Sequence, residues 1–149
     1  MKDAIIKLLL AIAELLRKPQ EIPVIQPCGT IDIHTASSIL LDKLDEMGDE
    51  AEIFLPDHEM KIYNKAEVMN SYELKGVSVI KYVLGVHDCD DFAAELFGKF
   101  AGLVWTMKHA LNWFIDETGT FWYIEPQNKK LSQVLENWQG YDVRFYLGR

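Results

Sequence analysis

The feature that most constrains the fold is a pair of β-prone runs joined by a short polar segment. Residues 109–115 and 120–125 are rich in aliphatic and aromatic side chains, and residues 116–119 (Asp-Glu-Thr-Gly) have the composition of a turn. We therefore predict an antiparallel hairpin in which His109 lies opposite Glu125, with the turn glycine in a left-handed or bulge conformation. A register shift of one residue would put these two side chains on opposite faces.

A helix is predicted before this hairpin, because apolar residues recur at three- and four-residue steps from Phe92 to Val104. Cys89 stands at or just before its start. The free amide groups and dipole of a helix N-terminus stabilise a thiolate, and the same amides can hold an oxyanion. Cys89 is therefore a candidate nucleophile, His109 a candidate base, and Glu125 the carboxylate that would orient the imidazole.

Residues 3–18 are predicted to form an amphipathic helix that ends before Pro19 and Pro23. We expect its broad apolar face to pack on the domain or on a partner subunit, so a homodimer is one expected assembly. A membrane-surface anchor is the alternative, and the few basic residues give it little support. The run is too short to span a bilayer, and no signal-peptide cleavage site follows it.

The remaining elements are predicted to be short. Helices are expected at 31–47 and 131–138, strands at 51–55 and 141–147, an irregular polar stretch with one helical turn at 57–74, and either a strand or a buried helix at 77–84. The four tryptophans are expected in the core. No repeat or linker divides the chain, so we predict one α+β domain over residues 1–149, with 1–18 as its N-terminal helix.

Charge and cysteine content narrow the partners. The chain of 149 residues has a formal net charge of −8, which repels phosphate backbones and anionic lipid but suits divalent cations. We therefore expect neither nucleic acid nor membrane as a partner. Two cysteines do not make a disulfide framework, so a reducing, cytoplasmic setting is expected.

Three motifs in this order resemble the papain-like cysteine peptidase superfamily. They are His87-Asp88-Cys89-Asp90-Asp91-Phe92-Ala93, His109-Ala110-Leu111-Asn112-Trp113 and Trp122-Tyr123-Ile124-Glu125-Pro126-Gln127. The pattern is most similar to the calcium-dependent papain-like domain of fungal agglutinins and to related bacterial and phage proteins, and it covers residues 80–128 without a sugar-binding half. This resemblance implies a papain-like α+β fold, with the helix of Cys89 packed on a small antiparallel sheet that carries His109 and Glu125.

The resemblance also implies a function, namely a thiol hydrolase that cleaves a peptide or other amide bond through a thioester on Cys89. Acyl transfer to an amine, as in transglutaminases, is one alternative. The other is a non-catalytic binding or structural module, of phage origin in some relatives, whose thiol is idle. Papain-like enzymes place a glutamine about six residues before the cysteine, and here Tyr82 and Val83 occupy that neighbourhood, which favours the non-catalytic alternative.

The aspartates beside Cys89 suggest a metal site. Like charge near a thiol disfavours the thiolate, whereas a bound divalent cation would reverse that effect. Ca²⁺ prefers several oxygen ligands, so Asp88, Asp90 and Asp91 are candidate ligands, although the chemistry itself requires no cofactor. Two alternatives stay open: Asp90 and Asp91 complement the helix dipole, or His87 joins Cys89, His109 and Glu125 around a transition metal.

Overall fold

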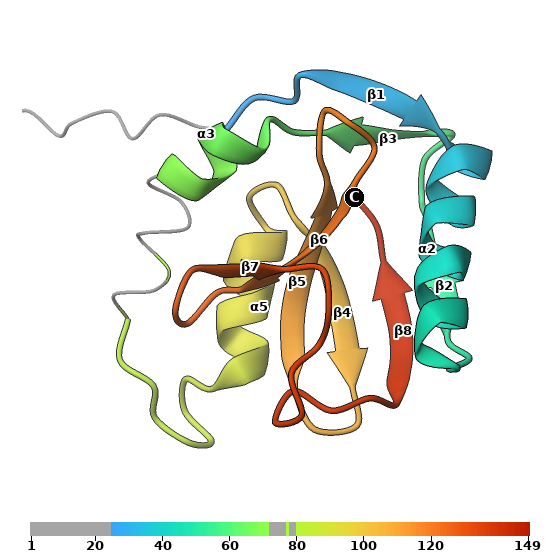
Figure 1. Ribbon diagram of the computed structural model, residues 1–149. Coiled ribbons are helices and arrows are strands. Elements are labelled where there is room, and N and C mark those ends of the chain that lie inside the picture. The colour runs from blue at the N-terminus through green and yellow to red at the C-terminus, as the bar shows by residue number, and fades with distance from the viewer. Residues whose placement is uncertain (1–24, 72–76, 78–79) are drawn as a thin grey trace, which may run out of the picture.

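The computed structural model describes residues 25–71, 77 and 80–149, and it confirms the α+β class (Figure 1). A six-stranded sheet has the strand order β2-β8-β4-β5-β6-β7, and β1 and β3 form a separate antiparallel pair. In the six-stranded sheet β2 runs parallel to β8, and the other neighbours are antiparallel. The predicted helix over 3–18 lies outside the described residues.

The bounds of the described elements are as follows. They are β1 (Gly29–Asp32), α2 (Ile33–Met47), β2 (Glu52–Phe54), β3 (Glu59–Ile62), α3 (Lys65–Asn70), α5 (Cys89–Phe97), β4 (Gly102–Thr106), β5 (Ala110–Ile115), β6 (Phe121–Glu125), β7 (Lys130–Ser132) and β8 (Val143–Leu147).

Helix α2 covers one face of the large sheet, and its local sequence explains both of its ends. Asp32 caps the start, where its side chain accepts hydrogen bonds from the backbone N–H groups of His34 and Thr35, each at 3.0 Å. Gly48, with φ of 66°, ends the helix in the left-handed conformation that glycine adopts readily. Leu40 and Leu44 lie one turn apart and are buried against the sheet.

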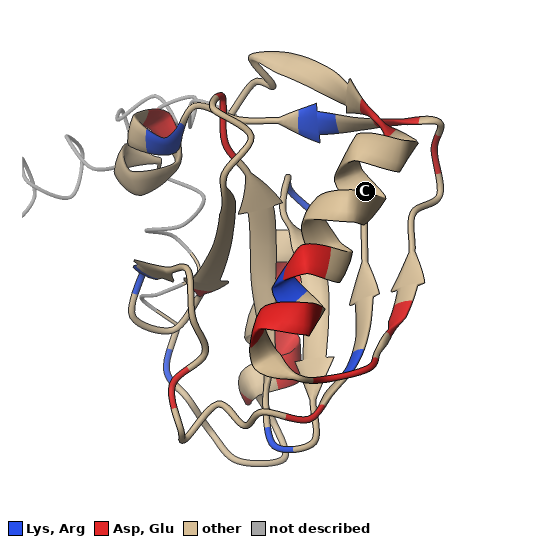
Figure 2. Cartoon of the chain, turned by 45° about the vertical axis from the view of Figure 1, so that its right-hand side comes forward, with Lys and Arg blue, Asp and Glu red and all other residues tan. Residues whose placement is uncertain are grey.

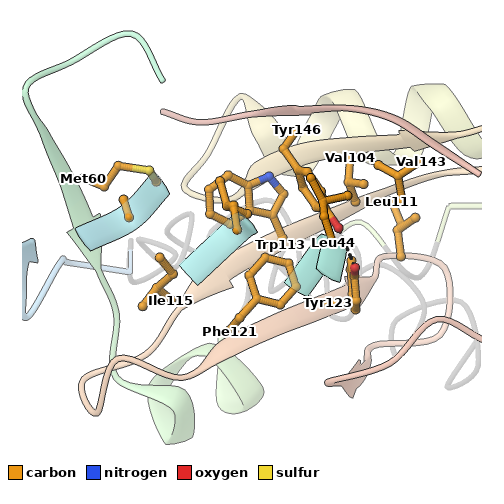
Figure 3. Packing of buried hydrophobic residues seen from close by; sticks show 12 residues of the cluster. Leu44, Met60, Val104, Leu111, Trp113, Ile115, Phe121, Tyr123, Val143 and Tyr146 are labelled. Carbon is orange, nitrogen blue, oxygen red and sulfur yellow. Dashed lines mark hydrogen bonds between the residues drawn. The ribbon is translucent and has the colours of Figure 1, made fainter. Parts of the chain in front are cut away.

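The core beneath α2 is rich in aromatic side chains, and Figure 3 shows how they interlock. We call this set the α2-side cluster; it includes Leu40, Leu44, Leu111, Trp113, Ile115, Phe121, Tyr123 and Tyr146. Its two buried hydroxyl groups, on Tyr123 and Tyr146, hydrogen-bond each other at 2.6 Å. Burial raises the pKa of Tyr123 to about 12 and raises that of Tyr146 as well, so both phenols stay neutral.

Helix α5 covers the opposite face of the sheet. Its Phe92 and Leu96 pack with Phe114 and Ile124 of the sheet, in what we call the α5-side cluster. The side chain of Asn112 points the same way and donates to the carbonyl groups of Ala93 (2.9 Å) and Gly102 (3.0 Å). This amide therefore ties the helix to the sheet.

The predicted helix after Cys89 is too long, because α5 ends at Phe97 and residues 102–106 form strand β4 instead. Leu103 and Val104 continue the helical spacing of α5, but glycines at 98 and 102 interrupt the helix between them and Phe97. A short apolar run with two glycines fits a strand as well as a helix, and pairing with β5 and β8 decides for the strand.

Other short elements also differ from expectation. The first and third strands, β1 and β3, were not predicted, and they stabilise each other across an antiparallel pairing. Residues 131–138 contain the end of β7 and turns instead of a helix. Trp138 in this stretch is half exposed, so the expectation of a core position is wrong for it, whereas Trp113 is fully buried.

Among the described helices, none has both the length and the apolar character that a bilayer-crossing segment requires.

Candidate functional site

The register of the β5–β6 hairpin differs from the prediction. Observed pairs run from Ile115 opposite Phe121 to Asn112 opposite Ile124, so the prediction that His109 lies directly opposite Glu125 is wrong. The five-residue segment 116–120 joins the strands, and its glycine has φ of 83°, as expected for the turn. The prediction assumed a tighter loop, and the difference shifts the pairing by two residues. An even shift preserves which face each side chain occupies.

His109 and Glu125 meet in spite of this shift. The distance from His109 Nε2 to Glu125 Oε2 is 2.7 Å, and the two side chains are 6% and 2% exposed. Gln139 Nε2 donates to the same carboxylate oxygen at 2.9 Å. The ring of Trp138 covers the imidazole, with 4.9 Å between the ring centroids. The backbone N–H of Gln127 donates to the other oxygen at 3.4 Å, so the carboxylate has three partners, and the segment between β7 and β8 covers the His109–Glu125 pair.

That segment, residues 133–142, is held in place by further hydrogen bonds, several of which involve Gln139 and Trp138. The hydroxyl group of Thr106 donates to the carbonyl oxygen of Gln139 at 2.5 Å, next to the β4–β5 turn. The backbone N–H of Glu136 donates to Gln139 Oε1 at 2.8 Å, and Trp138 Nε1 donates to Glu136 Oε2 at 2.6 Å. Gln139 was not predicted as a site residue, because nothing in the residues around it indicates that it lies beside Glu125.

Cys89 is the first residue of α5, as predicted, and is partly buried. Helix α5 begins at the end of the sheet where β5 also begins (Figure 1). Glu125 alternates with Phe121 and Tyr123 along β6, so its side chain lies on the α2 side of the sheet, whereas α5 covers the other side. Among the described residues, no hydrogen bond joins the sulfur of Cys89 to the ring of His109. The structure thus brings His109 and Glu125 into contact, and the membership of Cys89 in the same site stays a prediction.

The acidic residues at the start of α5 divide between two roles. One ligand atom each from Asp88, Cys89 and Asp90 lie within 4.8 Å of one another. A hydrogen bond between the carboxyl groups of Asp88 and Asp90 raises the pKa of Asp90 and lowers that of Asp88. Asp91 instead accepts from the backbone N–H of Asp88 at 3.1 Å, as a helix cap. Two carboxylates supply fewer oxygens than the roughly six to eight that Ca²⁺ takes, so the calcium site stays a prediction.

A groove lies elsewhere, between α2 and the segment that follows β7. It consists of two adjoining cavities of about 370 and 330 Å³, which share Lys43, Glu46, Gln133 and Val134. The first also reaches Asp42 and Phe121, and the second reaches Met47, Leu135 and Tyr141. Figure 2 shows the charged bands of α2 along this side of the molecule. The groove was not predicted from the sequence, since its walls come from segments far apart in the chain.

Comparison with known proteins gives a likeness in fold. No family model and no curated protein matches the chain by sequence. A solved structure described as the PSL1a–E64 complex matches with a TM-score of 0.63 and 22% identity, over 79% of this chain and 51% of that one. A structure of the lectin from Polyporus squamosus, bound to the human-type influenza-binding epitope Neu5Acα2-6Galβ1-4GlcNAc, matches with a TM-score of 0.62 and 22% identity, over 79% and 49%. The chain thus spans about half the length of these neighbours.

These neighbours correct the expected family and function. The second neighbour is described as a lectin, and at 22% identity the likeness to both establishes a shared fold. The identification of the chain as a papain-like cysteine peptidase, and its assignment as a thiol hydrolase, are therefore wrong. Cys at a helix start, followed by His and Glu on or beside two strands, describes an order in the chain, and that order by itself does not establish a peptidase.

Proposed function

We propose that this chain is a non-catalytic binding module whose ligand is a glycan, held in the groove between α2 and residues 133–141. The observation that carries the proposal is this two-part groove, with its mixed polar and apolar lining, in a fold shared with a lectin. Each cavity falls in the size range of small-molecule sites, which runs from about 300 to 1,000 Å³. Together they suit an oligosaccharide of a few units better than a single small ligand.

The lining suits the chemistry of a sugar. Hydroxyl groups both donate and accept hydrogen bonds, and Asp42, Glu46 and Gln133 provide acceptors and donors for them. The C–H faces of a pyranose ring need apolar or aromatic contacts, and Val134 and the half-exposed ring of Tyr141 provide these.

The charge of the groove favours a neutral sugar. Lys43 is the one cation among the lining residues, and its ammonium group pairs with Glu46 at 2.5 Å. Asp42 is left as an additional negative charge. An anionic sugar such as the Neu5Ac unit of the neighbour's ligand would be repelled here, so we expect the neutral analogue to bind more tightly.

A binding role also agrees with the state of the His109–Glu125 pair. The imidazole of His109 is bonded to Glu125 and covered by Trp138, and Cys89 forms no hydrogen bond with it among the described residues. Groups arranged in this way hold the residues 133–142 in position beside the groove. We therefore assign the pair a positioning role in the module.

Binding can be tested by titrating a panel of neutral and sialylated oligosaccharides into the protein by calorimetry and by ligand-observed NMR. We expect Gln133→Ala and Tyr141→Ala each to weaken the tightest ligand about tenfold, since each removes about 1.4 kcal/mol of contact energy. Asp42→Ala should weaken a neutral ligand and reduce the discrimination against a sialylated one. Asp45→Ala is the matched control, because Asp45 is exposed on the same helix but does not line either cavity.

Two outcomes would contradict the proposal. The first is the absence of binding by any oligosaccharide of the panel at millimolar concentration. The second is binding that the three groove variants leave unchanged, which would place the ligand elsewhere on the molecule.

A further inference from the structure

A short hairpin before α5 exposes an unusual number of large apolar side chains. Leu84 is 80% exposed and Val86 is 75% exposed. Their neighbours Ile80, Tyr82 and Val83 are also exposed, although each is aliphatic or aromatic. We call these five residues the apolar tip. Single exposed apolar residues are ordinary, but a contiguous group of this kind indicates a surface that another element covers.

The apolar tip is built as a defined structure. The backbone N–H groups of Val83 and His87 bond to the carbonyl groups of His87 (2.8 Å) and Val83 (2.7 Å), respectively, so the two residues form an antiparallel bridge. Gly85 between them has φ of 70°, and its N–H donates to the carboxylate of Asp88 at 2.8 Å. Leu84 and Val86 are therefore presented to solvent by a hydrogen-bonded turn.

The tip also contacts the domain core through the ring of Phe92. The rings of Tyr82 and His87 pack on Phe92 of α5, at centroid distances of 6.5 and 4.5 Å. Phe92 is buried in the α5-side cluster. Ile25, the first described residue of the chain, belongs to the same cluster. The point where the N-terminal segment joins the domain is thus part of the cluster on which the apolar tip rests.

The N-terminal segment also has an apolar surface that is expected to require a partner. Its sequence predicts an amphipathic helix over 3–18, with a broad apolar face that requires a partner. Such a helix would be about 24 Å long, and the six residues from 19 to 24 can span up to about 20 Å. The linker therefore allows the near end of the helix to lie up to about 20 Å from Ile25. In addition, Lys7 and Arg17 on its polar face would find exposed carboxylates, Asp90 and Asp91, beside the tip.

We propose that the apolar tip, residues 80–86, is the docking surface for the helix predicted over residues 3–18 of the same chain. A segment tethered to the same chain is favoured over a second copy of the chain, because its effective concentration at the tip is higher. A short linker presents its segment at an effective concentration in the millimolar range, far above that of a separate molecule in dilute solution. The proposal is independent of the glycan groove, which lies on the α2 side.

Hydrogen exchange measured by mass spectrometry on the full chain tests the docking. We expect the amides of residues 3–18 to be protected in the wild type, and to exchange about tenfold faster in Leu84→Asp and in Val86→Asp. Leu41→Asp is the matched control, since Leu41 is an exposed leucine on α2, away from the tip. Because Leu84 is almost fully exposed, its replacement should leave the thermal transition of the domain unchanged. Glycan binding should be unaffected in Leu84→Asp, so this test and that of the proposed function can fail separately.

Amine cross-linking distinguishes the candidate partners. We expect a cross-link between Lys7 and Lys81, which stands between Ile80 and Tyr82 of the tip. In a mixture of ¹⁴N- and ¹⁵N-labelled protein, we expect every cross-linked pair of peptides to carry the same label, because both lysines belong to one molecule. Links between labels, with protection that increases with protein concentration, would instead show a dimer and overturn the proposal. Unprotected residues 3–18 that become protected only on phosphatidylcholine–phosphatidylserine vesicles would overturn it in favour of a membrane surface. Equal exchange of 3–18 in wild type, Leu84→Asp and Val86→Asp would also overturn it.

Discussion

The two ends of the β5–β6 hairpin each hold a buried carboxylate, and the two are built in different ways. At the turn, Asp116 accepts hydrogen bonds from its own loop: Thr118 N–H and Oγ1 at 2.8 and 2.6 Å and Thr120 N–H at 3.0 Å, with Trp122 Nε1 at 2.7 Å. At the open end, Glu125 is bonded to His109 and to Gln139, from two other segments. The first site is local in the chain, and the second depends on the tertiary fold.

This difference shows what each carboxylate stabilises. The Asp116 bonds stabilise the conformation of a single loop, so their loss affects mainly that loop. The Glu125 bonds join β5, β6 and residues 133–142, so their loss affects how three segments pack. We therefore expect equally buried acids to have unequal effects on stability.

The largest effect is expected for Glu125→Ala. Removing one partner of a buried pair leaves His109 and Gln139 without their acceptor, which costs about 3–5 kcal/mol of unfolding free energy. Urea denaturation measures this loss, and Glu95→Ala on the exposed surface of α5 is the control. A loss below 1 kcal/mol would show that the pair is not a centre of stability and would remove the contrast between the two ends.

A smaller loss is expected for Asp116→Ala. The substitution removes the acceptor of four hydrogen bonds, but three of their donors lie in an exposed loop where water can replace the carboxylate. We expect a decrease of about 2–3 kcal/mol in the same urea experiment. Proteolysis should then begin in residues 116–120, while the segment 133–142 keeps the protection it has in the wild type. Loss of protection at both ends would contradict the local nature of this site.

Two glycines sharpen the comparison further. Gly119, at the turn, has φ of 83° and open space where a Cβ would stand, so Gly119→Ala should cost only backbone strain, about 1 kcal/mol. Gly140, next to Gln139, has φ of 89°, and a Cβ there would lie 3.0 Å from Thr106 Oγ1. We expect Gly140→Ala to cost about 2 kcal/mol, since it adds crowding to strain. Thermal unfolding of the two variants compares them directly, and equal losses would contradict the tighter packing of residues 133–142.

The smallest effect concerns pH. Burial alone would raise the pKa of Asp116, but the hydrogen bonds from Thr118, Trp122 and Thr120 together hold it below its usual value. A lowered pKa in the folded state stabilises the protein above the unfolded value of about 4, and that contribution is lost as pH falls through the folded pKa. The difference in stability between wild type and Asp116→Asn should therefore narrow below pH 4. A stability difference between wild type and Asp116→Asn that increases as the pH falls would show that the pKa of Asp116 is not lowered in the folded state.

The comparison also explains which parts the sequence could predict. Helix α2, the Asp116 turn and strands β5 and β6 follow from patterns within a few residues, and they were predicted close to their observed bounds. The pairing of β1 with β3, the place of Gln139 and the groove beside α2 depend on segments that meet only in the folded chain. For the same reason the place of Cys89 relative to His109 and Glu125 could not be inferred from the order of the three residues in the chain. Residues that meet through the fold leave no periodic signal in the chain.

The strand order has a consequence for how the molecule assembles. Strand β2 joins the large sheet only through β8, from which it is separated by about 90 residues. A ribosome that adds about 5–20 residues per second needs roughly 5–20 s to make that interval, so β2 has no partner strand for that time after it is made. We expect Ile53 and the apolar stripe of α2 to lack their native cover during this interval, which makes this part of the nascent chain prone to aggregation.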